Sequence, residues 1–321
     1  FQTVETINES RATRDRDTGA LFGGKPTESR ERNRLIWGDN RLVAGSLLKD
    51  YAGKVDLVYI DPPFDTGTDF SFRVQIGDSD VTKEPSILEE SAYRDTWGRG
   101  RSSYLGMLYE RIVLIHELLT ERGSLFLHLG SNVSHYGKVI CDEVFGTDAY
   151  VNEIIWKRAH AHGDVGQGAR HLGRLHDVIL LYRKSEEGTW NPQFEPYSDE
   201  IIQRDYSKMD DAGRRYQLTP IDGPGGEAKG NPRYEFLGVT RYWRFSRERM
   251  QEMYQQGRIV QTKPGAVPRQ KRYLDEMQGV ALQDIWMDIP PVQGQSHERL
   301  GYATQKPEAL LERIIKLTSN E

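Results

Sequence analysis

Residues Val55 to Phe64 read VDLVYIDPPF, and this stretch decides the fold. Its first six residues are mostly β-branched, aliphatic or aromatic, which is typical of a buried parallel strand. Pro62 and Pro63 lack the amide hydrogens that a strand ladder needs, so the strand must stop at Asp61. Open α/β sheets carry their chemistry at the carboxyl ends of their strands. We therefore expect a functional site at Asp61 to Phe64.

The residue types at this strand end suit the exocyclic amino group of a flat base. The Asp61 carboxylate and the Pro62 carbonyl can each accept one N–H, and Phe64 offers a face for stacking. Such an amine is a poor nucleophile because its lone pair is delocalised into the ring. Two acceptors out of the ring plane would localise the lone pair for attack on an electrophilic methyl group, through positioning and electrostatics. A strand-ending turn without a catalytic role is the alternative.

The segments around this strand predict an α/β fold. We expect strands at residues 35–37, 123–129 and 151–156, and helices at residues 40–50, 103–121 and 135–145. Strands that alternate with amphipathic helices are the pattern of a doubly wound sheet. Residues 65–100 are too long for a simple connection, so we expect this segment to have a functional role.

The whole chain divides into four parts. Residues 1–34 are polar and charged without periodicity, which predicts a mobile arm. Residues 35–156 form the first part of the catalytic core. Residues 157–284 are irregular, with one clear strand at 177–182, and we interpret them as an inserted target-recognition region. Residues 285–321 return to the core.

Composition limits the class of protein. The chain has 321 residues, of which 37% are hydrophobic and 28% charged, as in a soluble globular protein with one substantial core. No run is apolar enough to span a membrane, and we expect a cytoplasmic location. The single cysteine, Cys141, excludes an internal disulfide framework, and its apolar helix predicts a buried inert thiol. His160, His162, His171 and His176 lie near one another without cysteines, and we expect no metal site there.

The net charge is −5, so binding to nucleic acid would need a local basic patch. Between Asn231 and Leu274 the acidic residues are only Glu235, Glu248 and Glu252. The basic residues in this window are Arg233, Arg241, Arg244, Arg247, Arg249, Arg258, Lys263, Arg269, Lys271 and Arg272. Aromatic residues alternate with them, so cations can meet phosphates while rings stack on bases. The residues that we expect to bind DNA are Arg241, Trp243, Arg244, Arg247, Lys271 and Arg272. A solvated surface over its own aromatic core is the alternative.

Three stretches of the chain resemble the β-class DNA amino-methyltransferases, which use S-adenosylmethionine. They are IWGDN at residues 36–40 with KVDLVYIDPPFDTG at 54–67, the segment from LGMLYERIVL to NEIIWKR at 105–158, and YATQKPEALLERIIKLTSNE at 302–321. The likeness is greatest to site-specific adenine methyltransferases, including modification subunits of restriction systems. It implies a Rossmann-like sheet with an inserted recognition region, S-adenosylmethionine as methyl donor and double-stranded DNA as substrate. It also implies a second methyltransferase or restriction subunit as partner, in a prokaryotic or phage host.

The same resemblance makes Asp61, Pro62, Pro63 and Phe64 the catalytic motif. DPPF in place of SPPY favours adenine N6 over cytosine N4, which stays as the alternative target. An amino group inside a duplex cannot meet a methyl donor, so the base must be flipped into the site. Two further classes remain open, namely a DNA-binding subunit without catalysis and a methyltransferase that acts on RNA or on a protein amide.

The resemblance also implies that Gln305 and Lys306 contact the methyl donor, as does Asp61. Pro307 suits the start of a helix, where Lys306 and free amides would form a seat for the donor's carboxylate. Asp39 can accept from the donor's adenine amine or cap the helix that follows it. Relatives continue from this helix into a Gly-rich donor-binding loop, and we expect the sequence to end before that element.

Overall fold

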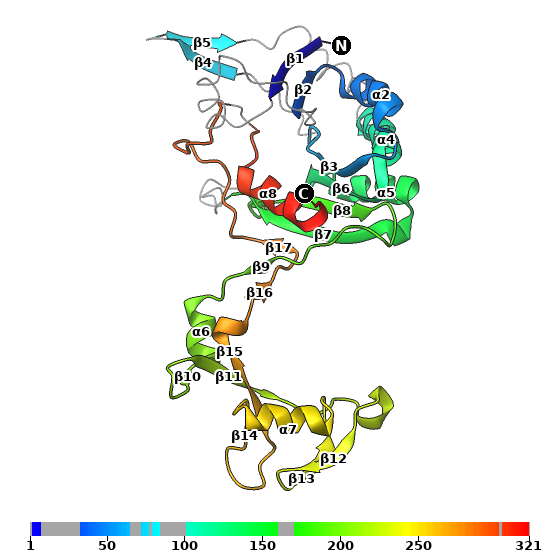
Figure 1. Ribbon diagram of the computed structural model, residues 1–321. Coiled ribbons are helices and arrows are strands. Elements are labelled where there is room, and N and C mark those ends of the chain that lie inside the picture. Colours follow the sequence, from blue (N-terminus) through cyan, green and yellow to red (C-terminus); the bar gives the residue numbers. More distant parts are fainter. Residues whose placement is uncertain are drawn as a thin grey trace, which may run out of the picture. The chain divides into compact units, whose positions relative to one another are not determined.

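The computed structural model describes residues 2–7, 33–64, 72–76, 79–83, 101–159, 170–301 and 304–320. It contains two compact units, Phe1–Asn191 with Gln283–Glu321, and Pro192–Leu282 (Figure 1). Most of the predicted arm, most of segment 65–100, and His160 and His162 lie outside the described residues. Within the described ranges no helix has the length and apolar character that a membrane span requires.

A mixed five-stranded sheet forms the centre of the first unit, in the order β17-β7-β8-β6-β3 (Figure 1). Its strands are β3 (Val55–Ile60), β6 (Leu119–Gly130), β7 (Tyr150–Lys157), β8 (His176–Arg183) and β17 (Ile285–Trp286). Strand β3 runs parallel to β6 and β17 parallel to β7, whereas β8 is antiparallel to β6 and β7. The α/β class is confirmed.

Strand β8 belongs to this sheet and not to the separate unit that follows it. Its run of apolar residues is buried throughout, so it needs strands on both edges and cover on both faces. The second compact unit therefore begins at Pro192, later than the boundary at residue 157 that the irregular sequence suggests.

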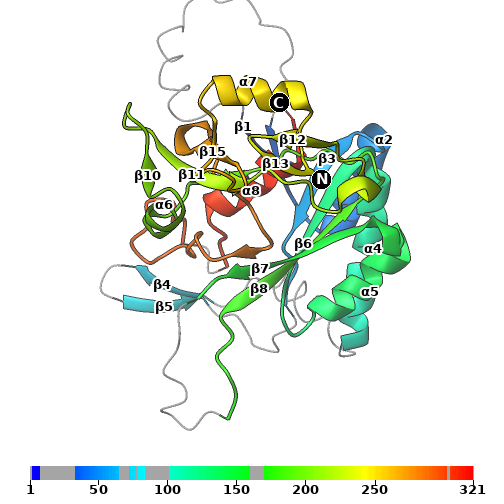
Figure 2. The same ribbon diagram turned by 90° about the horizontal axis from the view of Figure 1, so that it is seen from below.

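Helices cover both faces of the sheet. The helices α2 (Asn40–Tyr51), α4 (Arg101–Leu118) and α5 (Ser134–Phe145) lie on one side, and α8 (Glu308–Thr318) lies on the other (Figure 2). A short 3-10 helix, η2 (Thr147–Ala149), precedes β7. The main core lies between α4, α5 and the sheet, and it includes Leu108, Ile112, Leu125 and Leu180. Cys141 is part of this core, and burial raises the pKa of its thiol to about 12, so the predicted buried thiol is confirmed.

The strand predicted at residues 35–37 does not join the central sheet. It is β2 (Asn33–Trp37), which pairs antiparallel with β1 (Gln2–Ile7), a strand inside the predicted arm. Strand β3 is consequently an edge strand among the described residues, and no residue of β3 is fully buried. A second antiparallel pair, β4 (Phe72–Ile76) with β5 (Ser79–Lys83), occurs within the long segment after the DPPF motif.

The second unit consists of short strands and helices around its own core. Its sheet, in the order β10-β11-β15-β14, contains β10 (Lys208–Met209), β11 (Arg215–Pro220), β14 (Ile259–Val260) and β15 (Arg269–Tyr273). The other elements are α6 (Asp199–Asp205), η4 (Gly226–Lys229), the hairpin β12 (Arg233–Phe236) with β13 (Val239–Tyr242), α7 (Arg247–Gln255) and η5 (Leu274–Glu276). Strand β9 (Phe194–Glu195) pairs with β16 (Val280–Ala281) where the chain enters and leaves. Trp243, Met250, Met253 and Ile259 belong to the core.

Candidate active site

The segment Asp61–Phe64 follows directly after β3, at the carboxyl end of two parallel strands. The ladder stops at Ile60, as the two prolines predict, while β6 continues to Gly130. The side-chain amide of Asn132, just after β6, donates to the Phe64 carbonyl over 2.9 Å. A Cβ at Gly130 would lie 3.2 Å from Cδ2 of Phe64, so glycine leaves room for that ring. These neighbours place the motif at the sheet edge.

Lys306 forms an ion pair with Asp61. Its Nζ donates to Asp61 Oδ2 over 2.5 Å and to the Thr304 carbonyl over 3.1 Å. The same ammonium lies 5.4 Å from the ring centroid of Phe64, within the range of a cation–π contact. The Asp61 side chain remains 24% exposed, and nothing among the described residues donates to its Oδ1. Lys306 therefore engages one of the two carboxylate oxygens of Asp61.

The start of α8 brings Lys306 to the motif but engages Gln305 elsewhere. Gln305 Nε2 donates to the Glu298 carbonyl over 2.7 Å, and its Oε1 accepts from the Leu300 amide over 2.8 Å. Gln305 thus holds the loop before α8, and the structure gives it no contact with Asp61. The Glu308 amide, first in the helix, donates to Glu298 Oε2 over 2.9 Å. A carboxylate of the chain itself occupies the helix start, which shows that this position accepts such a group.

Asp39 caps helix α2. Its Oδ1 accepts from the backbone amides of Arg41 and Leu42, over 2.9 and 3.2 Å. Its Oδ2 lies 3.8 Å from Nη2 of Arg111. The capping alternative is therefore the one that the structure displays, and a donor contact at Asp39 stays a prediction.

A row of hydrogen-bonded polar side chains lies next to Phe64. The local sequence pattern does not predict it. The Tyr59 hydroxyl lies 2.6 Å from Nδ1 of His128, whose Nε2 lies 3.2 Å from Oδ2 of Asp177. Arg158 Nε completes the chain, 2.7 Å from Oδ1 of Asp177. His128 is 0% exposed and Asp177 2% exposed. The chain runs from the strand that carries DPPF, across the sheet, to an arginine at the surface.

The direction of these hydrogen bonds follows from the charges. Burial, followed by the charges of Asp61 and Asp177, raises the pKa of the Tyr59 hydroxyl far above its ordinary value, so it keeps its proton. The Asp177 carboxylate, paired with Arg158, is an acceptor. His128 therefore carries its proton on Nε2, donates it to Asp177, and accepts from Tyr59 at Nδ1.

A signal for this chain exists in the sequence. His128 interrupts the apolar run of β6, and Asp177 stands at the start of the apolar run of β8. A polar residue inside a buried strand needs a partner. The pairing itself depends on the antiparallel contact of β6 with β8, which no local pattern predicts.

Comparison with known proteins gives the family. Residues 55–321 match N6_N4_Mtase, the DNA methylase family. The chain belongs to this DNA methylase family. Strand β3, the DPPF segment and α8 all lie within the matched residues.

Two curated proteins illustrate the relationship. Type II methyltransferase M.EcaI of Enterobacter cloacae is 28% identical over 90% of this chain, which spans 60% of that protein. The StyLTI Mod subunit, from a type III restriction-modification enzyme of Salmonella typhimurium (strain LT2), is 26% identical over 89% of this chain, which spans 46% of the subunit. The chain thus spans roughly half the length of these relatives. The solved PvuII DNA methyltransferase (cytosine-N4-specific) gives a TM-score of 0.32 at 13% identity, over 49% of this chain and 51% of its own, which is too weak to support an inference.

In the second unit of this DNA methylase, Trp243 is a core residue. It is 0% exposed, its Nε1 donates to the Tyr234 carbonyl over 2.8 Å, and it packs with Phe236. The predicted contact of Trp243 with DNA is therefore wrong. The aromatic residues of this segment fill a core, which the sequence pattern does not distinguish from stacking residues.

The predicted basic residues are accessible to different degrees. Arg241, Arg244, Arg247 and Arg272 are exposed, although Arg244 Nε donates to the Asp222 carbonyl over 3.0 Å. Lys271 is half-buried, with its ammonium 5.0 Å from the Tyr216 ring.

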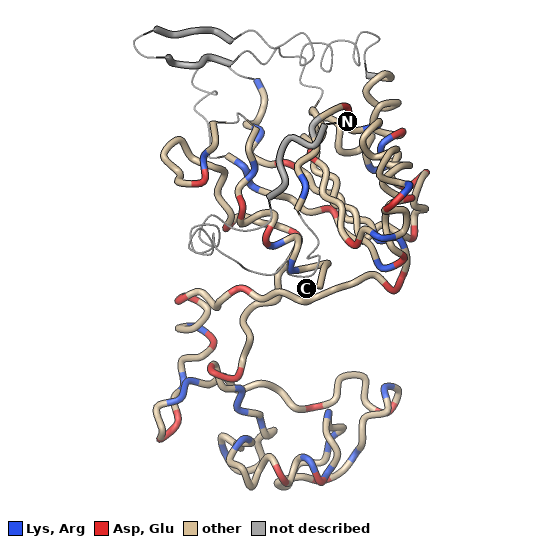
Figure 3. The backbone as a smooth tube through the Cα atoms, turned by 45° about the horizontal axis from the view of Figure 1, so that its top comes forward, with Lys and Arg blue, Asp and Glu red and all other residues tan. Residues whose placement is uncertain are grey.

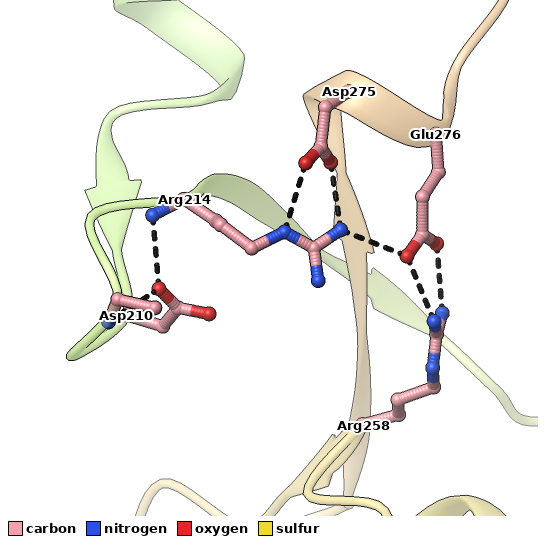
Figure 4. Close-up of polar contacts among 6 residues, drawn as sticks. Asp210, Arg214, Arg258, Asp275 and Glu276 are labelled. Carbon is pink, nitrogen blue, oxygen red and sulfur yellow. Dashed lines mark hydrogen bonds and ion pairs between the residues drawn. The ribbon is translucent and has the colours of Figure 1, made fainter.

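Part of the basic patch is neutralised. Arg258 makes two hydrogen bonds of 2.7 Å to Glu276, and Arg214 binds both Asp275 and Glu276 (Figure 4). These carboxylates follow directly after residue 274, where the sequence window ends. Figure 3 shows acidic and basic residues interspersed along the second unit. The positive charge available to phosphates is therefore smaller than the count over residues 231–274 suggests.

Proposed function

We propose that this protein transfers the methyl group of S-adenosylmethionine to N6 of a flipped adenine at specific sites in double-stranded DNA. Membership of the DNA methylase family supports this reaction class. The observation that carries it is the strand end itself, where the Asp61 carboxylate keeps one oxygen without a partner among the described residues, beside the Phe64 ring.

Asp61 and Pro62 act on the amino group of the base. Asp61 Oδ1 and the Pro62 carbonyl each accept one N–H, which draws the nitrogen toward a tetrahedral geometry and localises its lone pair. Lys306 holds Asp61 Oδ2 and thereby orients the carboxylate. Phe64 stacks on the ring of the base. After transfer the nitrogen must lose a proton, and Asp61 Oδ1 is the acceptor already hydrogen-bonded to it.

The residues at the start of α8 fit a donor with a carboxylate group. Glu298 Oε2 occupies this position on the Glu308 amide, so a carboxylate is accommodated there. Lys306 is the group that would hold the donor's carboxylate, and Asp39 is a further candidate for its adenine amine. S-adenosylmethionine, when bound, supplies an electrophilic methyl on a sulfonium.

The second unit supplies the choice of DNA sequence in this proposal. The flipped-base pocket sees one base only, so the remaining bases must be read elsewhere. The exposed residues Arg241, Arg244, Arg247 and Arg272 are candidates for phosphate contacts. Because one relative is a Mod subunit of a type III restriction-modification enzyme, we extend the proposal to a restriction subunit as partner and to action in the cytoplasm.

Tritium transfer from labelled S-adenosylmethionine tests this function. The full-length protein is incubated with unmethylated plasmid DNA, which is then digested to nucleosides and separated by chromatography. We expect label in N6-methyladenine. Label in N4-methylcytosine would move the assignment to cytosine, which the DPPF motif disfavours. DNA binding without transfer on any DNA would contradict the proposal. Transfer to RNA or to protein alone, in parallel reactions that offer DNA, RNA and protein separately, would contradict it as well.

A further inference from the structure

The polar side chains Tyr59, His128, Asp177 and Arg158, of which His128 and Asp177 are buried, are not used by the reaction described above. We propose that His128 is a positioning residue that fixes the Phe64 ring, and so sets the plane on which the flipped base stacks. This inference rests on the proposed function, because it concerns the same site.

His128 lies at the centre of a group of aromatic rings. Its ring centroid is 5.7 Å from that of Phe64, at an interplanar angle of 37°. The rings of Tyr59 and Trp156 lie 6.0 and 5.6 Å from it, both edge-on. Trp156 is itself fixed, because its Nε1 donates to the Ile289 carbonyl over 2.9 Å. Phe64 thus packs against a ring that is enclosed on its other sides.

The orientation of the His128 ring is determined by hydrogen bonds at both nitrogens. Rotation of the ring would break the 2.6 Å contact with Tyr59 and the 3.2 Å contact with Asp177 together. Asp177 lies opposite Gly130 on β6 and opposite Trp156 on β7 in the sheet register. Strands β3, β6 and β8 therefore each contribute one member of the chain to one fixed arrangement.

Stability alone is a poor explanation for this chain. A buried polar group costs free energy unless it is paired, and an apolar side chain of similar size would fill the space without that cost. What the polar chain provides is one defined orientation of His128. Because Phe64 packs on the His128 ring, a fixed His128 ring also fixes the orientation of Phe64, the residue that stacks on the base.

Two other contacts hold Phe64. Asn132 donates to its carbonyl, and the Lys306 ammonium approaches its ring. Removing His128 would therefore leave Phe64 attached but free to tilt. A small misplacement of a substrate-positioning group can lower a rate by about 100-fold. We expect His128→Leu to lower the methyl-transfer rate by roughly 10- to 100-fold, with DNA affinity unchanged.

Tyr182→Phe is the matched control. Tyr182 is also 0% exposed in the same sheet, and its hydroxyl donates to Asp142 Oδ1 over 2.6 Å. This substitution removes a partly buried hydrogen bond and lies outside the ring contacts of Phe64. In urea unfolding, Tyr182→Phe should lose about as much stability as His128→Leu does. Its methyl-transfer rate should equal that of the wild type. His128→Gln, which keeps a polar side chain, should recover part of the rate.

Two measurements on the full-length protein test whether His128 positions Phe64. One is the rate of single-turnover methyl transfer. The other is the fluorine NMR signal of 4-fluorophenylalanine at Phe64, which the variant Phe64→Tyr assigns. We expect His128→Leu to shift or broaden that signal and to slow transfer, and Tyr182→Phe to do neither. Equal signals and equal rates in the two variants would overturn the positioning role. If His128→Leu does not fold, Asp177→Asn is measured instead, with the same expected direction. A wild type without any methyl transfer would contradict the proposed function, while the fluorine signal would still decide the role of His128.

Discussion

One oxygen of the Asp61 carboxylate is held by the Lys306 ammonium, and the other has no partner among the described residues. An ion pair at a catalytic carboxylate would count against catalysis if it buried both oxygens. Here the Lys306 and Asp61 side chains remain 12% and 24% exposed, so the pair is only partly buried. At the scale of single residues, Lys306 thus acts on Asp61 as an orienting partner as well as a candidate donor contact.

Lys306→Met tests this role. Without the ammonium, the carboxylate loses its fixed orientation, and we expect the methyl-transfer rate to fall by roughly 10- to 100-fold while DNA affinity is kept. Lys316→Met is the control, because Lys316 lies on the same helix and pairs only with Glu312 within the described residues. Equal single-turnover rates for the two variants would show that the Lys306 pair is incidental.

At the scale of secondary-structure elements, the local patterns predict well and the long-range pairings do not. Apolar periodicity and the two prolines predict β3, and the same kind of pattern predicts α2 and α5. The helix predicted to residue 121 ends at Leu118, because residues 119–121 already belong to β6. The pairing of β2 with β1, and the place of β8 in the sheet, depend on contacts between distant segments.

The site shows the same division. The DPPF motif is visible in the sequence, because a proline pair after an apolar strand is a local signal. The contact of Lys306 with Asp61 joins residues 245 positions apart, and no local pattern predicts it. The sequence does not distinguish a buried Trp243 from one that stacks on DNA, because arginines flank an aromatic residue in both cases.

Glu276 gives an element-scale prediction for the second unit. Hydrogen bonds from Arg258 and then Arg214 lower the pKa of Glu276 to about 2 (Figure 4). A carboxylate whose pKa is lowered on folding stabilises the fold above its unfolded pKa, and this contribution is lost as the pH falls through its folded pKa. We expect Glu276→Gln to cost about 1 kcal/mol at neutral pH.

This cost should shrink as the pH falls from about 4.5 toward about 2, because wild-type Glu276 is then protonated. Urea unfolding of both proteins, followed by the fluorescence of the second unit's Trp243, measures it at several pH values. A difference in unfolding free energy that does not change with pH would exclude the charged network as its cause.

At the scale of the whole molecule, two compact units with separate cores divide the work of the proposed enzyme. The first carries the DPPF site, and the second carries the exposed arginines that we propose as phosphate contacts. A single-residue change in one unit should therefore alter one property and leave the other nearly unchanged.

Arg241→Ala against Arg249→Ala tests the DNA-binding role of the second unit. Arg241 is exposed and has no carboxylate partner among the described residues, whereas Arg249 pairs with Glu252 over 2.6 Å. Removing a phosphate contact lowers the slope of log affinity against log salt by about 1, so we expect this change for Arg241→Ala only. Fluorescence anisotropy of labelled duplex DNA across a salt series measures it. Identical slopes for the two variants and the wild type would exclude Arg241 from the interface.

In the proposed reaction, the Asp61 carboxylate at the end of β3 accepts a hydrogen bond from the amino group of the base during transfer. Single-turnover methyl transfer by Asp61→Ala in the full-length protein, with DNA affinity measured in parallel, tests it most directly. We predict a rate lower by about 1,000-fold or more with DNA affinity nearly unchanged, because the lost acceptor acts mainly in the transition state. A variant that methylates DNA at the wild-type rate would contradict the account.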